Sequence, residues 1–329
     1  MWWILRALVL VFAVAIAAAA YVYYLAAFDR SRPATETNVV VARGSTTHEV
    51  ARQLKASGVI GHVRLFELLA RAKRVETSVK AGEYRFGPKL TPLEVLDRVV
   101  TGGSQVAVWV TIPEGFTARE IAGVLADRNL GDGAALTEYF LRETIVLPDR
   151  SRSRNLEGLL FPNTYLMPLQ STPAALARIM TDQFSTELPR DAVERAKRLK
   201  LSIPQIVTLA SLIEREAKAD DERRLMAGVY YNRLRLNMPL EVDATIEYTF
   251  AHHKDVITRA DLARDTPYNT YLRQGLPPTP IANPGGPSLR AAFDPQPSDF
   301  LFYVYMGNGH HAFSRTLSEH NANVAKYLH

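Results

Sequence analysis

Cysteine is absent from the 329-residue sequence. This absence excludes disulfide bonds, thiolate nucleophiles and cysteine-ligated zinc. A glycine-rich phosphate loop and a Gly-x-Ser-x-Gly serine elbow are also missing, which argues against nucleotide-dependent and serine hydrolase chemistry. Lys and Arg number 39 against 34 Asp and Glu. This small excess suits an anionic partner but does not choose among a membrane face, a nucleic acid and an acidic polymer.

Signals for metal and nucleic acid binding are weak. His48-Glu49 begins like the zinc-protease pattern, but the second histidine is missing. The pairs His252-His253 and His310-His311 are adjacent, a spacing that points the two rings apart in a helix or strand. Basic residues do not cluster on an aromatic sheet pattern. We therefore predict no cofactor, no metal site and no nucleic acid partner.

The N-terminal region predicts a transmembrane anchor within residues 1–30. No charged residue occurs in residues 7–28, a run of about 22 residues that is long enough to cross a bilayer as a helix. Aromatic residues of the interfacial type flank the run: Trp2, Trp3, Tyr21, Tyr23 and Tyr24. The alternative is a signal peptide cleaved after the small residues 17–20. Arg6 competes with Arg30 and Arg32 under the positive-inside bias, so charge leaves the orientation open.

The sequence pattern of residues 31–112 predicts a small module of strands and capped helices, which begins with a polar linker at 31–37. Strands are expected at 38–42, 81–86 and 105–112. Capping boxes are expected at Thr46 with Glu49, Thr91 with Glu94 and Thr117 with Glu120. The phrases 44–54 and 115–125 share one pattern and indicate an internal repeat. Such units resemble LysM-type glycan-binding modules, and the alternative is a plain α+β packing domain.

Residues 113–329 predict a mainly helical catalytic domain with a C-terminal β-hairpin, which makes the whole chain α+β. Helices are expected at 173–186, 190–200, 203–219 and 221–236. In the last of these, Leu225, Val229 and Leu236 are expected inward, with Asn232 between them. Ser288 and Ser318 are expected to cap two later helices, and Gly307-Asn308-Gly309 to turn a hairpin. The proline- and glycine-rich segment 266–287 is expected to wall a groove.

Glu216 ends an apolar stripe. Apolar residues recur at helical spacing from Ile206 to Ile213, and the next position on that face is Glu216. Partial desolvation there raises the pKa of a carboxyl, which is how a general acid is made. Glu214 points about 200° around the helix and has different surroundings. The alternative is that Glu216 marks the rim of a core helix and bends into solvent.

Six motifs, taken together, resemble one known family. They are Ala210-Ser211-Leu212-Ile213-Glu214-Arg215-Glu216, Tyr231-Asn232-Arg233-Leu234, Asp243-Ala244-Thr245, Thr266-Pro267-Tyr268-Asn269-Thr270-Tyr271, residues 275–285, and Gly309-His310-His311-Ala312-Phe313. Their order and their spread over nearly the whole chain resemble the endolytic murein transglycosylase family (MltG/YceG-like). The resemblance implies cleavage of peptidoglycan glycan strands, without metal or cofactor, to leave 1,6-anhydro sugar ends and to terminate the elongation of nascent strands.

The resemblance also implies roles, partners and a location. The catalytic residue is the second glutamate of the Glu-x-Glu pair, Glu216. The expected substrate-binding or supporting residues are Glu214, Asn232, Asp243, Thr245, Tyr268, Asn269, Tyr271 and His311. Peptidoglycan strands, the inner membrane and cell-wall synthases of the penicillin-binding type are the implied partners. A single-pass anchor in the cytoplasmic membrane would place the catalytic domain in the periplasm.

Three positions depart from the family pattern. Glu241 replaces a glutamine, Thr279 a glycine and Asn163 an aspartate. If Glu241 lines the groove, its charge is expected to raise the pKa of Glu216 by repulsion. Two other functions stay open on the residues alone. One is a true hydrolase with Glu241 or Asp243 as the base for water, and the other is an anchored glycan-binding protein without activity.

Overall fold

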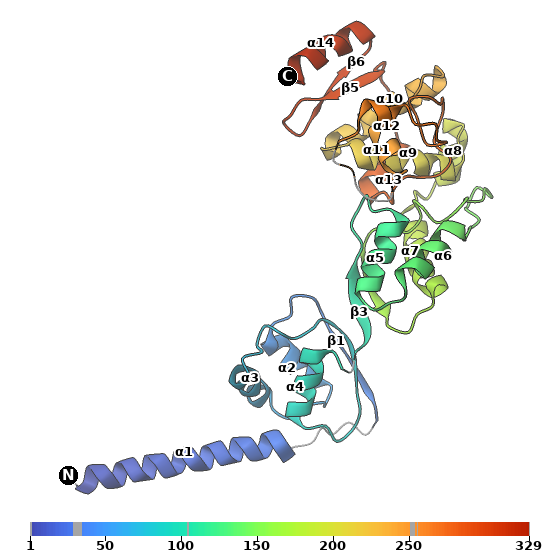
Figure 1. Cartoon of the computed structure of the whole chain (residues 1–329). Coiled ribbons are helices and arrows are strands. Elements are labelled where there is room, and N and C mark those ends of the chain that lie inside the picture. Colours follow the sequence, from blue (N-terminus) through green and yellow to red (C-terminus); the bar gives the residue numbers. More distant parts are fainter. Residues whose placement is uncertain (1, 29–34, 104, 251–253, 255, 329) are drawn as a thin grey trace. The chain divides into compact units, whose positions relative to one another are not determined.

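The computed structural model describes the chain except for residues 1, 29–34, 104, 251–253, 255 and 329 (Figure 1). The pair His252-His253 and most of the linker expected at 31–37 therefore lie outside the described residues. The chain divides into two compact units. One comprises Met1–Val110 with Tyr165–Gln170, and the other Thr111–Thr164 with Ser171–His329. The short return of Tyr165–Gln170 to the first unit was not expected, because we predicted one boundary near residue 112.

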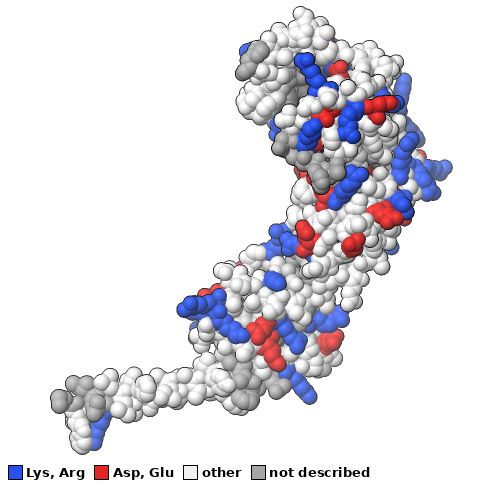
Figure 2. Space-filling view, in the orientation of Figure 1, with Lys and Arg blue, Asp and Glu red and all other residues white. Residues whose placement is uncertain are grey.

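Helix α1 (Trp2–Phe28) is a single unbroken helix. Its stretch Arg6–Leu25 has a mean hydropathy of 2.4 and is long enough to cross a membrane. Arg6 is the one charged residue in the sequence of α1, and the face of the helix visible in Figure 2 is otherwise without Lys, Arg, Asp or Glu. The helix continues through residues 17–20, where the signal-peptide alternative places cleavage. Length and composition thus fit the predicted anchor, although a signal sequence meets the same criteria.

A four-stranded sheet, ordered β1-β2-β3-β4, contributes to the first unit. The elements are β1 (Thr37–Val41), α2 (Thr47–Ala56), α3 (Val63–Ala72), β2 (Gly82–Phe86), α4 (Pro92–Thr101), β3 (Gln105–Thr111) and β4 (Thr164–Pro168). Strand β2 runs antiparallel to both β1 and β3, and Val39 lies opposite Tyr84. Tyr84, Phe86 and Phe66 are fully buried in the core that the sheet and the helices share. The three expected strands are confirmed to within a residue, whereas α3 and β4 were not predicted.

The three predicted capping boxes are confirmed. Thr46, Thr91 and Thr117 each accept a hydrogen bond from the backbone of the glutamate three residues later, and that glutamate accepts from the threonine backbone in return. The two repeated phrases form the same local structure, a strand, a glycine turn and a capped helix. Gly44 and Gly115 have φ values of 77° and 78°, a left-handed conformation that glycine adopts without strain. The likeness to LysM modules stays a prediction.

Helix α9 (Ile203–Glu216) lies at the centre of the second unit and packs against α8, α10, α11 and α13 (Figure 1). The other helices before the C-terminal hairpin are α5 (Ala118–Asp127), α6 (Gly133–Arg142), α7 (Pro173–Glu187), α8 (Ala192–Leu199), η1 (Asp220–Glu222), α10 (Arg223–Arg235), α11 (Asp243–Glu247), α12 (Arg259–Leu262) and α13 (Gly286–Phe293). Residues 206–213 of α9 are buried on every side. A helix buried all round positions its ends rigidly, because any shift would open gaps in a close-packed core.

The C-terminal region forms the predicted hairpin and a final helix. Strands β5 (Phe302–Tyr305) and β6 (His311–Ser314) pair antiparallel, and α14 (Leu317–Tyr327) follows. Thr316 caps α14 because Glu319 completes a capping box with it, so the prediction of Ser318 as the cap was wrong.

Two further details differ from prediction in the second unit. Helix α13 begins at Gly286, with Gly285 as the cap, and this places Ser288 inside the helix instead of at its start. The inward face of α10 agrees with the expected one only in part. Val229 is buried as expected, but Leu225 is half-buried and Leu236 is 49% exposed beyond the helix end. Met226, Tyr230 and Arg233 are buried instead. An arginine on the buried face hides the true stripe from a hydrophobicity pattern.

Candidate active site

Glu216 is the last residue of α9, and local sequence explains why the helix presents it there. Ser202 and Gln205 form a capping box at the start, and Pro204 occupies the first turn, where no backbone donor is needed. The Ala217 N–H closes the final turn on the carbonyl of Ile213. The buried apolar turns behind Glu216 hold its backbone in place, while its side chain remains partly exposed to solvent. The helix therefore presents a carboxyl at the edge of an apolar core.

The environment of Glu216 raises the pKa of its carboxyl to about 7, mainly through burial. The negative charge of Asp243 raises this pKa further, and a hydrogen bond from Tyr303 opposes both effects. The Tyr303 hydroxyl donates to Oε2 at 3.2 Å. Glu216 Oε1 has no hydrogen-bond partner within the part of the chain that the structure describes. A carboxyl with a pKa near 7 and one unengaged oxygen can deliver and recover a proton at neutral pH.

Glu214 lies in different surroundings from Glu216, as helix geometry predicted. Its Oε2 accepts from the Gly285 N–H at 3.0 Å and lies 3.5 Å from Nη1 of Arg223. The side chain is only 7% exposed. Glu114 lies close by, and burial followed by the charge of Glu214 raises the pKa of Glu114. Glu214 thus ties α9 to the start of α13 and to α10, a supporting contact on the far flank of the helix.

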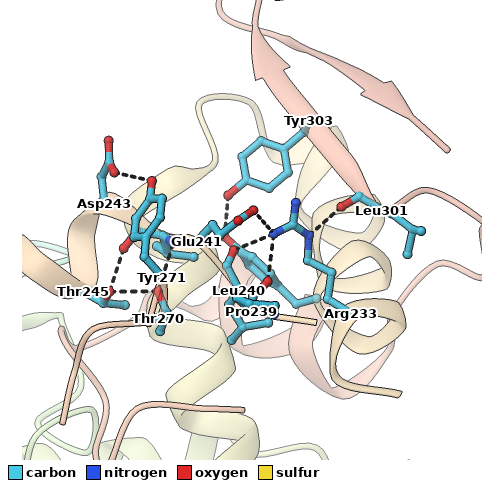
Figure 3. Close-up of polar contacts among 12 residues, drawn as sticks. Arg233, Pro239, Leu240, Glu241, Asp243, Thr245, Thr270, Tyr271, Leu301 and Tyr303 are labelled. Atoms are coloured by element: carbon cyan, nitrogen blue, oxygen red, sulfur yellow. Dashed lines mark hydrogen bonds and ion pairs between the residues drawn. The ribbon is translucent and has the colours of Figure 1, made fainter. Parts of the chain in front are cut away.

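Asp243 and Tyr271 form a second polar pair near Glu216 (Figure 3). The Tyr271 hydroxyl points at the carboxylate of Asp243 and donates to Oδ1 at 2.6 Å. Burial and then the hydrogen bond to Asp243 raise the pKa of Tyr271, and the charge of Glu216 adds to this. Asp243 is exposed at the start of α11. Its open side and its pairing with a tyrosine are suited to hydrogen bonds with sugar hydroxyls.

Thr245 lies behind this pair and is completely buried. Its hydroxyl donates to the Val242 carbonyl at 2.7 Å and lies 3.0 Å from the Thr270 hydroxyl. The Val242 N–H in turn donates to Thr270 at 3.0 Å. These bonds join the start of α11 to the segment that carries Tyr271 (Figure 3). Thr245 therefore helps to hold the Asp243–Tyr271 pair in position through its bonds to the neighbouring backbone and to Thr270.

Glu241 forms an ion pair with Arg233. Nη1 of Arg233 donates to Oε2 of Glu241 at 2.8 Å and to the carbonyls of Pro239 and Leu240, while Nε donates to the Leu301 carbonyl (Figure 3). Arg233 is 6% exposed. The carboxylate whose charge raises the pKa of Glu216 is Asp243, whereas Glu241 forms an ion pair with Arg233. A glutamate at 241 gains a charge-assisted bond instead.

Asn269 and Tyr268 form hydrogen bonds within the segment 266–287 and to the residues just before it. Asn269 is completely buried, donates to the carbonyls of Leu262 and Arg264, and accepts from the N–H groups of Tyr271 and Leu272. The Tyr268 hydroxyl forms a hydrogen bond with the Thr279 hydroxyl at 2.8 Å. Thr279, which departs from the family pattern, therefore has a local partner. Asn269 therefore shapes the loop and has no spare hydrogen-bonding capacity for a sugar.

Asn232 and His311 hold the C-terminal hairpin. The Asn232 amide donates to the carbonyls of Ser298 at 2.7 Å and Phe300 at 3.1 Å. The His311 N–H donates to Oε1 of Glu222 at 2.8 Å, and Nδ1 lies 3.0 Å from Oε2 of the same residue. The His311 ring meets Tyr303 edge-on, with centroids 5.6 Å apart. These contacts position Tyr303, so both residues act on Glu216 from a distance.

The proline-rich segment lines a hollow at the start of α9. A cavity of about 520 Å³ is bordered by residues 275–280 and by the start of α9, at Ser202, Pro204 and Gln205. Glu216 ends the same helix about 20 Å away. The expected groove wall thus borders the start of α9, while Tyr271 of the same segment lies near Glu216. Asn163, the remaining departure, accepts from the Thr164 N–H at 2.7 Å.

No metal cluster emerges from the described side chains: none of them form a group of three or more His, Asp or Glu that could hold an ion. His310 instead lies 3.7 Å from Asp221, and His311 pairs with Glu222.

Of the predicted set, the structure brings Glu216, Asp243 and Tyr271 together. The other predicted residues make contacts within and between the surrounding elements: Glu214, Asn232, Thr245, Tyr268, Asn269 and His311. We did not predict Tyr303, Tyr230 or Arg233. The buried position of Arg233 seven residues after Met226 could have been found from the α10 pattern. Tyr303 carries no such local signal.

Comparison with known proteins identifies the family of this chain. The YceG-like family profile matches residues 39–326. The chain belongs to the YceG-like family. An endolytic murein transglycosylase of Bacillus subtilis strain 168 is 32% identical over 311 residues, which cover 89% of this chain and 85% of that protein. Its namesake from Streptococcus pneumoniae strain D39 is 28% identical, and the match covers 97% of this chain and 64% of the pneumococcal protein.

A solved structure of the family supports the fold. The crystal structure of a YceG-like protein from Listeria monocytogenes has 30% sequence identity to this chain and a TM-score of 0.57. The match covers 88% of this chain and 99% of the Listeria chain. The resemblance stated from six motifs is confirmed, as is a mixed helix and strand architecture.

Proposed function

We propose that this YceG-like chain is a membrane-anchored endolytic transglycosylase that cleaves peptidoglycan strands between N-acetylmuramate and N-acetylglucosamine. The observation that carries the proposal is Glu216, whose pKa is raised to about 7 at the edge of an apolar helix. The names of the Bacillus and Streptococcus relatives support peptidoglycan as the substrate. Residues 31–112 would add affinity for glycan, and cell-wall synthases would be partners on the same face of the membrane.

The mechanism needs one carboxyl. Protonated Glu216 gives its proton to the glycosidic oxygen as the bond from C1 of the muramate breaks. Ionised Glu216 then takes the proton of the muramate 6-hydroxyl, whose oxygen bonds to C1. The products are a 1,6-anhydro-muramate end and a free N-acetylglucosamine end, and Glu216 regains its proton. No water is consumed, so no second carboxylate at hydrolase spacing is required.

Asp243 is the observation that keeps a hydrolase as the second candidate. It is an exposed carboxylate whose charge acts on Glu216, so it could serve as a base for water. Glu241 is less suited to that role because Arg233 pairs with it.

The sugar ends released from purified peptidoglycan test the proposal. We expect the full-length protein in detergent to release 1,6-anhydro-muramate ends, which are one water lighter than reducing ends. The masses of the new ends, measured by mass spectrometry after digestion, decide the reaction. Reducing ends would favour the hydrolase with Asp243 as base. The absence of new ends, with binding to insoluble peptidoglycan retained, would favour the glycan-binding protein.

The anchor gives a separate prediction. Because α1 is uncharged between Arg6 and its end, we expect the full-length protein to stay in the membrane fraction after alkaline washing. N-terminal sequencing of that fraction should begin at or near Met1. A mature protein that starts near Tyr21 would show that a peptidase removes the helix. Protease protection in spheroplasts would test the proposed periplasmic position of the catalytic unit.

A further inference from the structure

Tyr303 reaches Glu216 from a strand 87 residues further along the chain. Its hydroxyl lies 3.2 Å from Oε2 of Glu216 and 2.8 Å from the hydroxyl of Tyr230. Tyr230 comes from α10 and is completely buried, and the two rings meet edge-on with centroids 6.1 Å apart. Three oxygens from α9, α10 and β5 thus form one line of hydrogen bonds behind the catalytic carboxyl.

The direction of this line follows from its donors. A tyrosine has one hydroxyl proton, and a buried hydroxyl without an acceptor costs free energy. Tyr303 is the one hydrogen-bond partner of the Tyr230 hydroxyl among the described residues. Tyr230 therefore donates to Tyr303, and Tyr303 donates to Oε2 of Glu216. With Oε2 occupied as an acceptor, the acid proton of Glu216 belongs on Oε1, the oxygen without a partner in the described chain.

We propose that Tyr303, supported by Tyr230, is a positioning residue that directs the transferable proton of Glu216 to Oε1. The inference rests on the proposed function, because it assigns a role within that reaction. The same oxygen would release the proton to the glycosidic oxygen and recover it from the 6-hydroxyl. Tyr303 would fix which oxygen faces the sugar throughout the cycle, a geometric demand that general acid catalysis makes on its donor.

The surrounding contacts make Tyr303 a fixed part of the site. The rings of His311 and Tyr303 pack perpendicular to each other, and His311 is bound to Glu222 through both its backbone and its ring. Arg233 binds the carbonyl of Leu301, two residues before Tyr303. The hairpin is therefore attached on both sides of the tyrosine, as a group that orients another requires.

The groups that act on Glu216 define the expected effect of removing the tyrosine hydroxyl. Asp243 on α11 raises the pKa of Glu216, while Arg215 and Lys218 on its own segment lower it. Tyr271 and Tyr230 also face its charge. The hydrogen bond from Tyr303 lowers the pKa because it stabilises the ionised form. Tyr303→Phe should thus raise the pKa of Glu216, while the aromatic packing of the hairpin is kept.

The test is the pH profile of kcat/KM for release of sugar ends by the full-length protein in detergent. The reaction starts from protonated Glu216, so the wild-type profile should fall above about pH 7. In Tyr303→Phe we expect the fall of kcat/KM to occur at a pH about one unit higher. A shift of this size is the effect of losing one hydrogen bond to a charged group. We also expect kcat at the optimum to fall about tenfold with little change in KM, because the role assigned to Tyr303 is to orient Glu216 and not to bind the sugar.

Two matched variants complete the test. Tyr230→Phe should also shift the fall of kcat/KM to higher pH, but by a smaller amount, because it removes only the hydroxyl that donates to Tyr303. Tyr231→Phe is the control, because this neighbour donates to the Ala292 carbonyl and should leave the pH of this fall unchanged. A fall at the same or a lower pH in folded Tyr303→Phe would overturn the proposal, as would an equal shift in Tyr231→Phe. If Tyr303→Phe does not fold, Tyr230→Phe decides by the same criterion.

A measurement without substrate separates this inference from the proposed function. The infrared band of protonated Glu216 can be identified by its loss in Glu216→Gln and then titrated in wild type and Tyr303→Phe. An upward shift of the titration supports the positioning role even if no sugar ends are released. Equal titrations overturn it even if wild type is an active transglycosylase.

Discussion

Glu216→Gln is expected to lower the rate of strand cleavage by a factor of at least about 10² to 10⁴, the usual contribution of general acid–base catalysis. Glutamine keeps the size of the side chain, and its amide oxygen still accepts from Tyr303. It cannot give a proton to the leaving oxygen or take one from the 6-hydroxyl. The measurement is the initial rate of 1,6-anhydro end formation on purified peptidoglycan, with variant and wild type at equal folded concentration.

Glu214→Gln is the matched control on the same helix. Glu214 binds Gly285 and Arg223 on the opposite flank, so its loss should weaken a support and leave a measurable enzyme. Both variants must first show a cooperative melting transition. Near-normal turnover in Glu216→Gln together with an inactive Glu214→Gln would place the chemistry on the Glu214 face and contradict the assignment.

The raised pKa of Glu216 also predicts how the contribution of this residue to folding stability depends on pH. The folded state holds this proton with a pKa of about 7, against 4.5 for the ordinary carboxyl. The folded state therefore binds more protons between these values, and the contribution of Glu216 to stability is lost as pH rises through that window. Glu216→Gln should melt at or above the wild-type temperature at pH 8 and show no such gain at pH 5.

Glu157→Ala is expected to have the largest effect on stability. Glu157 is 1% exposed, and its carboxyl accepts from the Ala118 N–H at 2.8 Å, the Asn283 amide at 2.9 Å and the Tyr248 hydroxyl at 3.0 Å. Alanine would leave these three donors without that acceptor, which should cost about 3 kcal/mol or more. The melting temperature should fall by roughly 6 to 12 °C, as measured by calorimetry at pH 5.

Glu157→Gln is the conservative partner of this variant. Its amide oxygen can still accept from Ala118 and Asn283, and its NH₂ group can donate to the Tyr248 oxygen. Burial raises the pKa of Glu157 to about 7, so wild type should lose stability between pH 4.5 and 7, by at most about 3 kcal/mol. Glu157→Gln should not lose it and should be the more stable protein at pH 8. Equal melting of the alanine and glutamine variants would show that this network does not stabilise the fold.

The family comparison strengthens only part of this picture. Membership of the YceG-like family and the names of its relatives support peptidoglycan as the substrate. The role of each side chain rests on geometry. Asn269 illustrates the difference, because it lies within a family motif and yet all its hydrogen bonds close the loop that carries it.

Sequence alone determined the features that depend on neighbours a few residues apart. The capping threonines, the hairpin turn, the apolar α1 and the stripe that ends at Glu216 all follow from short-range spacing and local hydrogen bonds. Errors occurred where one local signal competed with another. Ser318 was chosen over Thr316 as a cap, although Glu319 forms its box with Thr316.

Tertiary structure decided the partners of those residues. Tyr303 meets Glu216 across 87 residues, and Asn283 meets Glu157 across 126. Periodicity determines which face of a helix is buried but not which distant side chain lies against it, because that depends on how complete elements pack. The sequence therefore identified the candidate acid, and the packing of α10, α11 and the hairpin around α9 set its pKa and the oxygen that carries its proton.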